Sequence, residues 1–440
     1  MTHFKTFILS CLLALAAFPA IAERADFIVD GFGYAITSTT DLTVKVVEGP
    51  DQAVVTVPST VVFNKRTFRV TEISNDAFYN HENLTSVDMP SITYISNGYE
   101  EHPQLFGAFS GCKNLYQVNM PSATFIGDYA FCDCDALTNV TLPVATDIGK
   151  FAFSYCNALT SVTLPAATSI GENAFQYCNA LASVSLPAAT SIGKNAFQFC
   201  DALTSVTLPA ATSIGDHAFC DCKSLTNVAL PAATFIDYYA FESCDALTSV
   251  TMPAAWSIGE GAFSSCGLTS VSLPAATSIG NGAFAGCGSL TSVTLPAATS
   301  IGYAFCDCQS LSDIYVGSDP AYCNSSPFDN VTYATATLHV PAGCASKYKA
   351  ARGWEQFAFI SEDYDPTGIK NINAEKVKVL CENGNVNITG LKNGEKVEFY
   401  SVSGKLLGTS VANAGAVSIN TTEHIVICKM AGTSIKVLVK

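Results

Sequence analysis

Hydrophobic residues along most of the chain follow one pattern that repeats every 21 or 22 residues. Phenylalanine marks it most clearly, recurring 22 residues apart at positions 109, 131, 153, 175, 197, 219, 241 and 263, and then 21 apart at 284 and 305. The full unit is L-x-x-V-x-L-P-x-A-T-x-I-G-x-x-A-F-x-x-C. A fixed period in the twenties is typical of a solenoid, because one coil cannot bury its own hydrophobic face and must stack on its neighbours.

Each unit predicts two short buried stretches. Leu159, Val162 and Leu164 alternate with polar residues, which favours a short strand with these side chains inward. Pro165 ends that strand because proline cannot donate to a continuing ladder. A second buried stretch begins at Ile170, and Gly171 after it suits a corner with left-handed backbone.

The interior of the stack is predicted to contain columns of identical side chains. Parallel pairing of successive coils places matching residues ~4.8 Å apart, so about eleven coils would make a rod roughly 50 Å long. One column is phenylalanine and another is the cysteine three residues later. Their central members are Phe153, Phe175, Phe197, Phe219, Phe241, Cys156, Cys178, Cys200, Cys222 and Cys244.

The chain has 18 cysteines, and we expect the column cysteines to be buried thiols. Stacked neighbours would have Cβ atoms ~4.8 Å apart, whereas a disulfide needs about 3.8 Å. Buried thiols act as small, unreactive hydrophobic groups. Three Cys-Asp-Cys triplets, at 132–134, 220–222 and 306–308, resemble metal ligands, but each already gives one cysteine to the column and zinc sites use C-x₂₋₄-C pairs. We therefore expect no metal and no other cofactor.

Charge is sparse and acidic, with 22 Lys+Arg against 37 Asp+Glu and a net charge of −15. The basic surface that phosphate backbones require is missing, which disfavours nucleic acid and anionic membranes as partners. One charged column alternates in sign, at Asp128, Lys150, Glu172, Lys194 and Asp216. Opposite charges on adjacent coils stabilise the register modestly, so we interpret this column as structural.

The outward positions of the first strand carry mainly hydroxyl residues. They are Ser161/Thr163, Ser183/Ser185, Ser205/Thr207, Asn227/Ala229, Ser249/Thr251, Ser270/Ser272 and Ser292/Thr294. The array is either a solvated sheet face or an extended contact surface. Ice binding is disfavoured, since serine often replaces threonine and Ala229 interrupts the rows.

Catalytic signatures are lacking in the sequence. The six histidines are scattered, and no nucleophile elbow, phosphate loop or H-E-x-x-H motif occurs. We therefore expect a protein that is not an enzyme.

The first 22 residues have the pattern of a secretory signal peptide. Lys5 precedes an apolar run, and Ala20-Ile21-Ala22 provides a small-residue cleavage site. A lipoprotein attachment at Cys11 is a weaker alternative, because the apolar run continues beyond it. No other stretch has the ~18 apolar residues of a transmembrane helix, so we expect no transmembrane segment in the mature chain.

The repeat resembles the BspA-like leucine-rich repeat family of secreted and surface proteins. The resemblance rests on I-G-x-x-A-F-x-x-C followed by L-x-x-V-x-L-P, and it implies a leucine-rich repeat solenoid over residues 71–316. The flanks resemble that family too, which implies a β-rich N-terminal cap at 23–70 and a C-terminal cap at 317–362. Caps are needed because both ends of a solenoid expose a hydrophobic cross-section.

One coil carries nine extra residues within SNGYEEHPQLFG, at 96–107. Insertions in solenoids become loops on one face, often the binding face. Tyr99 and Phe106 could anchor a ligand there, and Glu100, Glu101 and His102 could set the charge and pH response. The alternative is a tolerated surface insertion.

Residues 363–440 lose the repeat and show alternating strands with turn pairs such as Asn393-Gly394, which predicts a small antiparallel β-sandwich. The segment resembles the C-terminal sorting domain of the type IX secretion system of Bacteroidota, which implies the secretion machinery as a partner. The matching residues are Ile388, Gly390, Leu391, Gly394, Val397, Tyr400, Gly404, Lys405 and Lys436 to Lys440. An ordinary β-sandwich accessory domain is the alternative.

Together these features predict a mainly β protein that is secreted or held at the outer-membrane surface. We expect an adhesin-type module that binds an extracellular protein or glycan of a host or neighbouring cell. A structural surface spacer with no ligand is the alternative.

Overall fold

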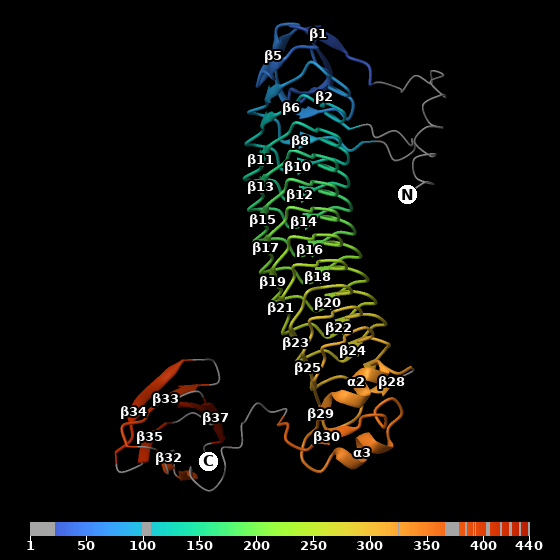
Figure 1. The fold of residues 1–440 in the computed structure, drawn as a ribbon. Coiled ribbons are helices and arrows are strands. Elements are labelled where there is room, and N and C mark those ends of the chain that lie inside the picture. The colour runs from blue at the N-terminus through green and yellow to red at the C-terminus, as the bar shows by residue number, and fades with distance from the viewer. Residues whose placement is uncertain are drawn as a thin grey trace.

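Two short strands form in every coil of the repeat, and together the coils build a mainly β solenoid (Figure 1). The computed structural model describes residues 23–98, 107–323, 325–365 and, with short gaps, 378–438. In one coil, β13 (Ser161–Thr163) exposes its two hydroxyl residues and buries Val162, while β14 (Ser169–Ile170) buries Ile170. The alternation in the sequence therefore gives the inward and outward faces as predicted.

The shorter strands of the coils stack in parallel and continue into the N-terminal cap as one sixteen-stranded sheet. Its members are β1 (Phe27–Val29), β2 (Phe32–Ser38), β3 (Thr43–Glu48), β5 (Thr60–Phe63), β6 (Arg66–Ile73), β8 (Tyr94–Ile95), β10 (Phe125–Ile126), β12 (Asp147–Ile148), β14, β16 (Ser191–Ile192), β18 (Ser213–Ile214), β20 (Phe235–Ile236), β22 (Ser257–Ile258), β24 (Ser278–Ile279), β26 (Ser300–Ile301) and β28 (Tyr322–Cys323).

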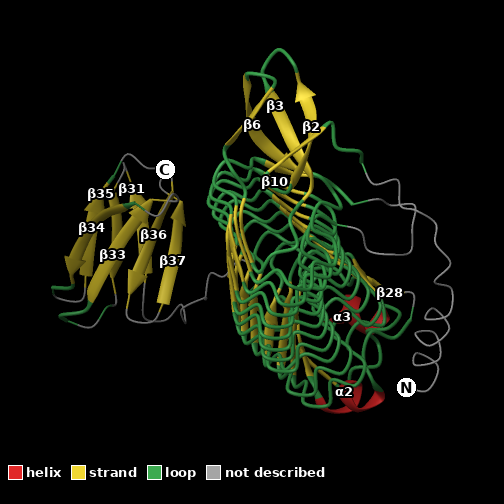
Figure 2. Cartoon of the chain, turned by 90° about the horizontal axis from the view of Figure 1, so that it is seen from above, coloured by secondary structure: helices red, strands yellow, loops and turns green. Residues whose placement is uncertain are grey.

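The longer strands form a second wall of the solenoid, seen edge-on in Figure 2. A nine-stranded parallel sheet contains β4 (Val54–Thr56), β7 (Ser86–Asp88), β9 (Gln117–Asn119), β11 (Asn139–Thr141), β13, β15 (Ser183–Ser185), β17 (Ser205–Thr207), β19 (Asn227–Ala229) and β21 (Ser249–Thr251). A five-stranded parallel sheet continues with β23 (Ser270–Ser272), β25 (Ser292–Leu295), β27 (Asp313–Val316), β29 (Thr337–His339) and β30 (Phe359–Ser361).

The break between these two sheets falls where the repeat loses one residue. Three positions separate Cys244 from Leu247, whereas only two separate Cys266 from Leu268. The segment between β22 and β23 is one residue shorter as a result, and the ladder of longer strands is interrupted between β21 and β23. The shorter strands β22 and β24 stay paired across the same point, through Ile258 and Ile279.

The phenylalanine column runs through the core as a stack of parallel rings. Phe197 lies 5.2 Å from Phe175 and 5.2 Å from Phe219, measured between ring centroids, and all three are fully buried. Phe153 and Phe241 continue the stack on either side at 5.3 Å and 5.2 Å. Each ring therefore contacts a ring of the coil before and of the coil after.

The cysteine column is buried beside the rings, and its thiols have a partner that we did not predict. The Cys178 sulfur donates to the carbonyl oxygen of Phe153 in the preceding coil at 3.2 Å, and Cys200 donates in the same way to Phe175. Cys156, Cys222 and Cys244 repeat this contact at 3.2 Å. A thiol thus pairs a buried carbonyl that an alanine would leave without this donor. None of the described cysteines forms a disulfide.

The prediction of left-handed backbone at Gly171 is wrong. The positive φ angles in that coil belong to Asn173 (φ 56) and Tyr177 (φ 61), and Gly171 is not among the residues with positive φ. Glycine is needed at 171 for a different reason, because a Cβ there would lie 2.6 Å from the carbonyl carbon of Gly149 in the coil below. Close approach of the two backbones, rather than an unusual dihedral angle, selects glycine.

The two ends of the solenoid are covered by elements that extend its sheets. At the N-terminal end, β4 pairs in parallel with β7 and β6 pairs in parallel with β8. At the other end, β29 and β30 continue the five-stranded sheet, and helices α2 (Asn330–Thr335) and α3 (Ala345–Ala350) lie over the last coils (Figure 1). Trp354 is fully buried there and donates to the carbonyl oxygen of Ala321 at 2.9 Å.

The C-terminal segment is a β-sandwich of two antiparallel sheets. One sheet contains β31 (Lys378–Glu382), β32 (Asn385–Thr389) and β35 (Ala416–Asn420), and the other contains β33 (Lys396–Ser401), β34 (Leu406–Val411), β36 (Ile425–Met430) and β37 (Thr433–Leu438). Val386, Ile388, Val397 and Phe399 belong to its own hydrophobic core. The solenoid and its caps share a separate core that runs from Phe27 to Phe357.

Candidate functional site

The insertion predicted to carry the binding site lies mostly outside the described residues. Tyr99, Glu100, Glu101, His102 and Phe106 all belong to the part that is not described, so their role stays a prediction. The described residues before the insertion are attached to the next coil. The backbone N–H of Gly98 donates to the carbonyl oxygen of Asp128 at 2.9 Å, and the N–H of Asp128 donates to the Asn97 side chain at 3.0 Å.

The same irregular coil leaves a groove on the other wall of the solenoid, between β9 and β11. The parallel ladder joining these strands contains one residue pair, Gln117 with Asn139, whereas β11 and β13 are joined by three pairs. Val118 in the middle of β9 is only partly buried, while Val140 and Val162 at equivalent positions are buried. The wall is therefore loosened at this point, and the core valine of β9 is partly accessible.

The groove has a volume of about 630 Å³ and is lined by the outward residues of three successive strands. Ser86 and Asp88 come from β7, Gln117 and Asn119 from β9, and Asn139 and Thr141 from β11; Val87, Val118, Tyr116, Thr138, Pro121 and Pro143 complete the lining. Tyr116 immediately precedes β9 and is half exposed. Since outward side chains alternate along each strand, three adjacent strands bring their polar residues to one surface.

Hydrogen bonds hold several of these side chains in place. The Asn119 amide donates to Asp88 at 2.6 Å, which links β9 to β7. The Asn139 amide donates to the Thr138 hydroxyl at 3.2 Å, and the Asn139 carbonyl oxygen accepts from the Ser161 hydroxyl at 2.6 Å. The groove thus presents amides that are already oriented, a carboxylate and an aromatic ring.

Sequence reasoning missed this groove, although a signal for it was present. The outward pairs on the central strands are mostly Ser and Thr, whereas β7 and β9 carry Ser/Asp and Gln/Asn. Neither the regular hydroxyl array nor the inserted loop predicts a groove on this wall. Larger amide side chains next to a change in coil length were the signal that pointed to this wall.

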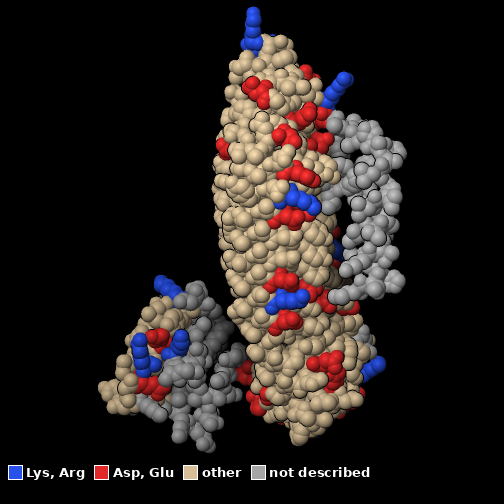
Figure 3. Space-filling model, turned by 45° about the horizontal axis from the view of Figure 1, so that its top comes forward, with Lys and Arg blue, Asp and Glu red and all other residues tan. Residues whose placement is uncertain are grey.

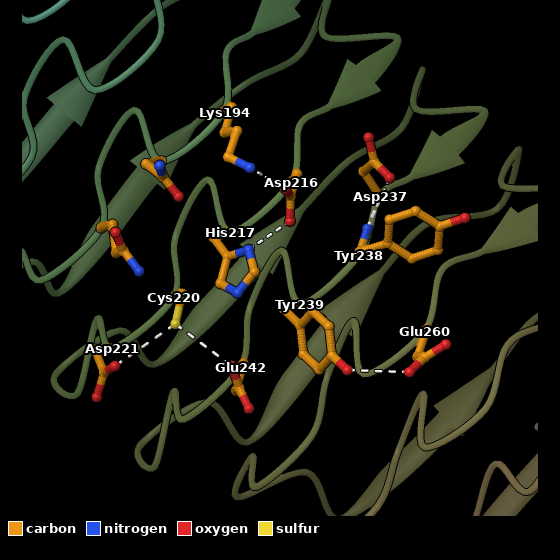
Figure 4. Close-up of polar contacts among 12 residues, drawn as sticks. Lys194, Asp216, His217, Cys220, Asp221, Asp237, Tyr238, Tyr239, Glu242 and Glu260 are labelled. Carbon is orange, nitrogen blue, oxygen red and sulfur yellow. Dashed lines mark hydrogen bonds and ion pairs between the residues drawn. The ribbon is translucent and has the colours of Figure 1, made fainter.

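A second group of polar residues lies on the turns between 194 and 260 and is drawn in Figure 4. Lys194 forms an ion pair with Asp216 at 2.7 Å, and Asp216 also hydrogen-bonds the His217 ring. His217 stacks on Tyr239 with the ring centroids 5.0 Å apart. The Tyr239 hydroxyl in turn donates to Glu260 at 3.1 Å.

Cys220 lies in the same group, and its surroundings do not favour a reactive thiol. Its sulfur lies 3.5 Å from an Asp221 carboxylate oxygen and 3.7 Å from a Glu242 carboxylate oxygen, so the single thiol proton can be donated to either carboxylate. Burial, with the nearby Asp221 charge, raises the pKa of Cys220 to about 12. A thiol held protonated at neutral pH is a poor nucleophile, so the proximity of histidine, aspartate and cysteine provides no activated nucleophile here.

On the face drawn in Figure 3, acidic and basic side chains lie close together in small groups on an otherwise mostly uncharged rod. In the alternating charged column, the ion pair between Lys194 and Asp216 joins opposite charges of two neighbouring coils. Burial raises the pKa of Asp216, but hydrogen bonds from Lys194 and His217 outweigh it and lower the pKa of that carboxyl below its ordinary value. The hydrogen bond and the charge of Asp216 raise the pKa of Lys194.

Within the described residues, no group of three or more His, Cys, Asp or Glu residues is arranged to hold a metal ion. Among the helices in the described part of the chain, none has the length and apolar character needed to cross a membrane.

Comparison with solved structures shows the fold. The chain is similar to a leucine-rich repeat protein from Bacteroides ovatus, with 23% identity, a TM-score of 0.50, and coverage of 76% of this chain and 88% of that one. It also matches a leucine rich cell surface protein from Faecalibacterium prausnitzii, with 25% identity, a TM-score of 0.36, and coverage of 66% and 94%. No curated protein matches the sequence.

Comparison with family patterns identifies the repeat. The pattern described as the BspA type leucine rich repeat region matches residues 71–190, 105–226, 190–257 and 234–346. These segments overlap and cover the solenoid together with part of the C-terminal cap, which is more than half of the chain. The chain belongs to the BspA-type leucine-rich repeat family.

Proposed function

We propose that the protein is exported and acts as an adhesin-type module that binds extracellular macromolecules. Membership of a leucine-rich repeat family supports an interaction role, because solenoids present extended surfaces on which partners dock. The observation that carries the proposal is the groove at β7, β9 and β11. It combines oriented polar groups with a half-exposed aromatic ring on an otherwise uniform wall. Elsewhere on that wall, the outward positions carry few large polar side chains.

Export is part of this proposal. Residues 1–22 would direct secretion, and residues 363–440 would be recognised by a type IX secretion machine. The separate core of the β-sandwich supports a segment that folds by itself. We expect that fusing residues 363–440 to a periplasmic reporter, in a host with this machinery, places the reporter on the cell surface. Retention of the fusion in the periplasm would leave the sandwich as an accessory domain.

A spacer without a ligand is the second candidate, and the central coils favour it. From β13 to β21 the outward residues are nearly invariant and small. Any binding site built from these residues would be repeated on several coils, which increases avidity more than specificity. A rod of this kind could simply hold another part of the protein away from a surface.

Adhesion of residues 23–365 to immobilised extracellular-matrix and bacterial-surface proteins tests the proposal. This fragment contains the whole solenoid core and both caps. We expect saturable adhesion to at least one of these surfaces. Absence of adhesion to all of them, with a folded fragment, would support the spacer.

Two variants of this fragment locate the contact. Replacing residues 97–105 with a short Gly-Ser link tests the insertion, and it should leave melting unchanged while removing most adhesion if Tyr99 to His102 form the site. Deleting residues 179–222, which are two coils, is the matched control for the central wall. Adhesion that survives the first change but weakens after the second would assign binding to the hydroxyl face.

A further inference from the structure

The groove beside Tyr116 has the size of a small-ligand site and an unusual lining for this molecule. Its volume of about 630 Å³ lies within the roughly 300–1,000 Å³ that ligand sites occupy. Val118 forms part of the lining and keeps some exposure, so the groove offers an apolar contact beside its polar groups. Tyr116 is 50% exposed and supplies a flat ring that a ligand can cover.

The polar groups of the groove both donate and accept hydrogen bonds. Asn119 and Asn139 are oriented by Asp88 and Ser161, as described above. The Gln117 side chain has no hydrogen-bond partner among the described residues, so both its amide donors and its carbonyl oxygen are available. An alcohol also donates and accepts at the same oxygen, and a row of amides therefore matches a ligand with several hydroxyl groups.

The charges that line the groove further restrict the class of ligand. The lining contains one carboxylate, Asp88, and no lysine, arginine or histidine. A phosphate, sulfate or carboxylate group would approach Asp88 without a compensating cation, which is unfavourable. A strand-like peptide would need a run of free backbone groups along one strand edge, and the pair of Gln117 with Asn139 still joins β9 to β11 at one end of the groove.

We propose that this groove binds an uncharged saccharide chain, with a sugar ring stacked on Tyr116 and its hydroxyl groups bound by Gln117, Asn119 and Asn139. The apolar C–H face of a sugar suits the face of an aromatic ring, and the edge hydroxyls suit the amides. Asp88 orients Asn119 and can accept a further hydroxyl. The proposal rests on the proposed binding function and names its ligand class.

Titration of the mature chain, residues 23–440, with neutral oligosaccharides tests the proposal. The probes are hexamers of glucose, xylose, mannose and N-acetylglucosamine, with a hexamer of galacturonic acid as the anionic control. Isothermal titration calorimetry should show binding of at least one neutral probe and none of the anionic probe. Since one aromatic contact carries much of such an interface, Tyr116→Ala should weaken binding about tenfold or more, and Gln117→Ala should weaken it about threefold.

The matched control is Tyr238→Ala, because Tyr238 is 55% exposed but does not line the groove. This variant should bind the neutral probe as the wild type does, and both tyrosine variants should melt normally. The proposal is overturned if no neutral probe binds at millimolar concentration, if the anionic probe binds best, or if Tyr116→Ala binds unchanged. Adhesion to enzymatically deglycosylated matrix proteins, without any oligosaccharide binding, would overturn the saccharide assignment and leave the adhesin function standing.

Discussion

The central coils and the coils next to the N-terminal cap share one core but differ on their surface. In both regions the phenylalanine rings stack, with Phe109 lying 4.8 Å from Phe78 and 5.0 Å from Phe131. The central coils are joined by full strand ladders and present small hydroxyl residues. The earlier coils contain an insertion, a ladder reduced to one pair and a groove lined by amides.

This difference shows that the core columns and the outer surface of a solenoid are under separate constraints. A coil stays in the stack as long as its inward residues match those of its neighbours. Its turns and outward positions then accept insertions, deletions and larger polar residues. Function in this chain is therefore expected where the surface pattern breaks while the core pattern continues.

The largest difference along the solenoid should appear at high pH, between the residues before Cys112 and the coils that follow it. Residues 12–111 contain no cysteine, whereas the later coils carry the cysteine column. Burial raises the pKa of Cys112 and Cys287 to about 12 and raises the pKa of Cys178 and Cys222 well above its ordinary value. The folded chain keeps thiol protons that the unfolded chain releases. The cysteine column therefore contributes its full stability below about pH 8.5, and above that pH each thiol lowers the free energy of unfolding by about 1.4 kcal/mol per pH unit.

Urea unfolding followed by circular dichroism, in reductant at several pH values, measures this loss. We expect the column coils to unfold between about pH 9 and 10, where several thiols act together. A variant with Cys178, Cys200 and Cys222 changed to alanine should show a shallower dependence on pH. Stability that does not change up to about pH 10 would show that the column does not hold protonated thiols.

The second largest effect should follow from the loss of one phenylalanine ring. It should lower the free energy of unfolding by similar amounts in the two regions. Phe197→Ala is expected to cost about 3–5 kcal/mol, because the cavity cannot collapse between two fixed rings. Phe109→Ala should cost a similar amount, since it also has a ring on either side. Both are measured by urea unfolding. A wild-type midpoint for Phe197→Ala would refute the stacked core, and a much smaller cost at Phe109 would show that the earlier coils pack differently.

Added bulk between coils should have a moderate effect. A Cβ at Gly193 would lie 2.7 Å from the carbonyl carbon of Gly171, so Gly193→Ala should cost roughly 1–3 kcal/mol through overpacking. Gly288→Ala is the matched control, because nothing lies within 4 Å of a Cβ there. Thermal melting distinguishes the two. Equal melting of both variants would contradict the close approach of the backbones. Between residues 127 and 302, Asp237 is the one residue other than glycine at this position of the coil.

Of the features compared, the charged column should contribute least to the free energy of unfolding. Asp216 has a pKa below its ordinary value, so its contribution is present above about pH 4 and is lost as the pH falls through the folded value. Because Lys194 is half exposed and Asp216 is a quarter exposed, we expect Asp216→Asn to cost less than about 1 kcal/mol at neutral pH. The cost should shrink further in high salt. A loss of several kcal/mol would mean that the charged column is a main source of the stability of the stacked coils.

Most of the solenoid could be predicted from one repeat unit. The alternation around Val162, the stop at Pro165 and the spacing of the phenylalanines were sufficient, because each coil meets the same neighbours as every other coil. Gly171 could not be assigned correctly, since its need for glycine arises from the backbone of Gly149, which is distant in the sequence. The contact of Cys178 with the Phe153 carbonyl was missed for the same reason.

The sequence by itself determined the repeat, the inward and outward faces, the acidic and sparsely charged surface, and the family, because these depend on composition and local periodicity. Tertiary structure alone decided how neighbouring coils fit together. It placed Asp88, Asn119 and Asn139, which belong to three different coils, on one groove beside Tyr116. It also separated the long-strand sheet at the point where the repeat loses a residue. Such features depend on small differences between successive coils, which accumulate only when the coils are stacked.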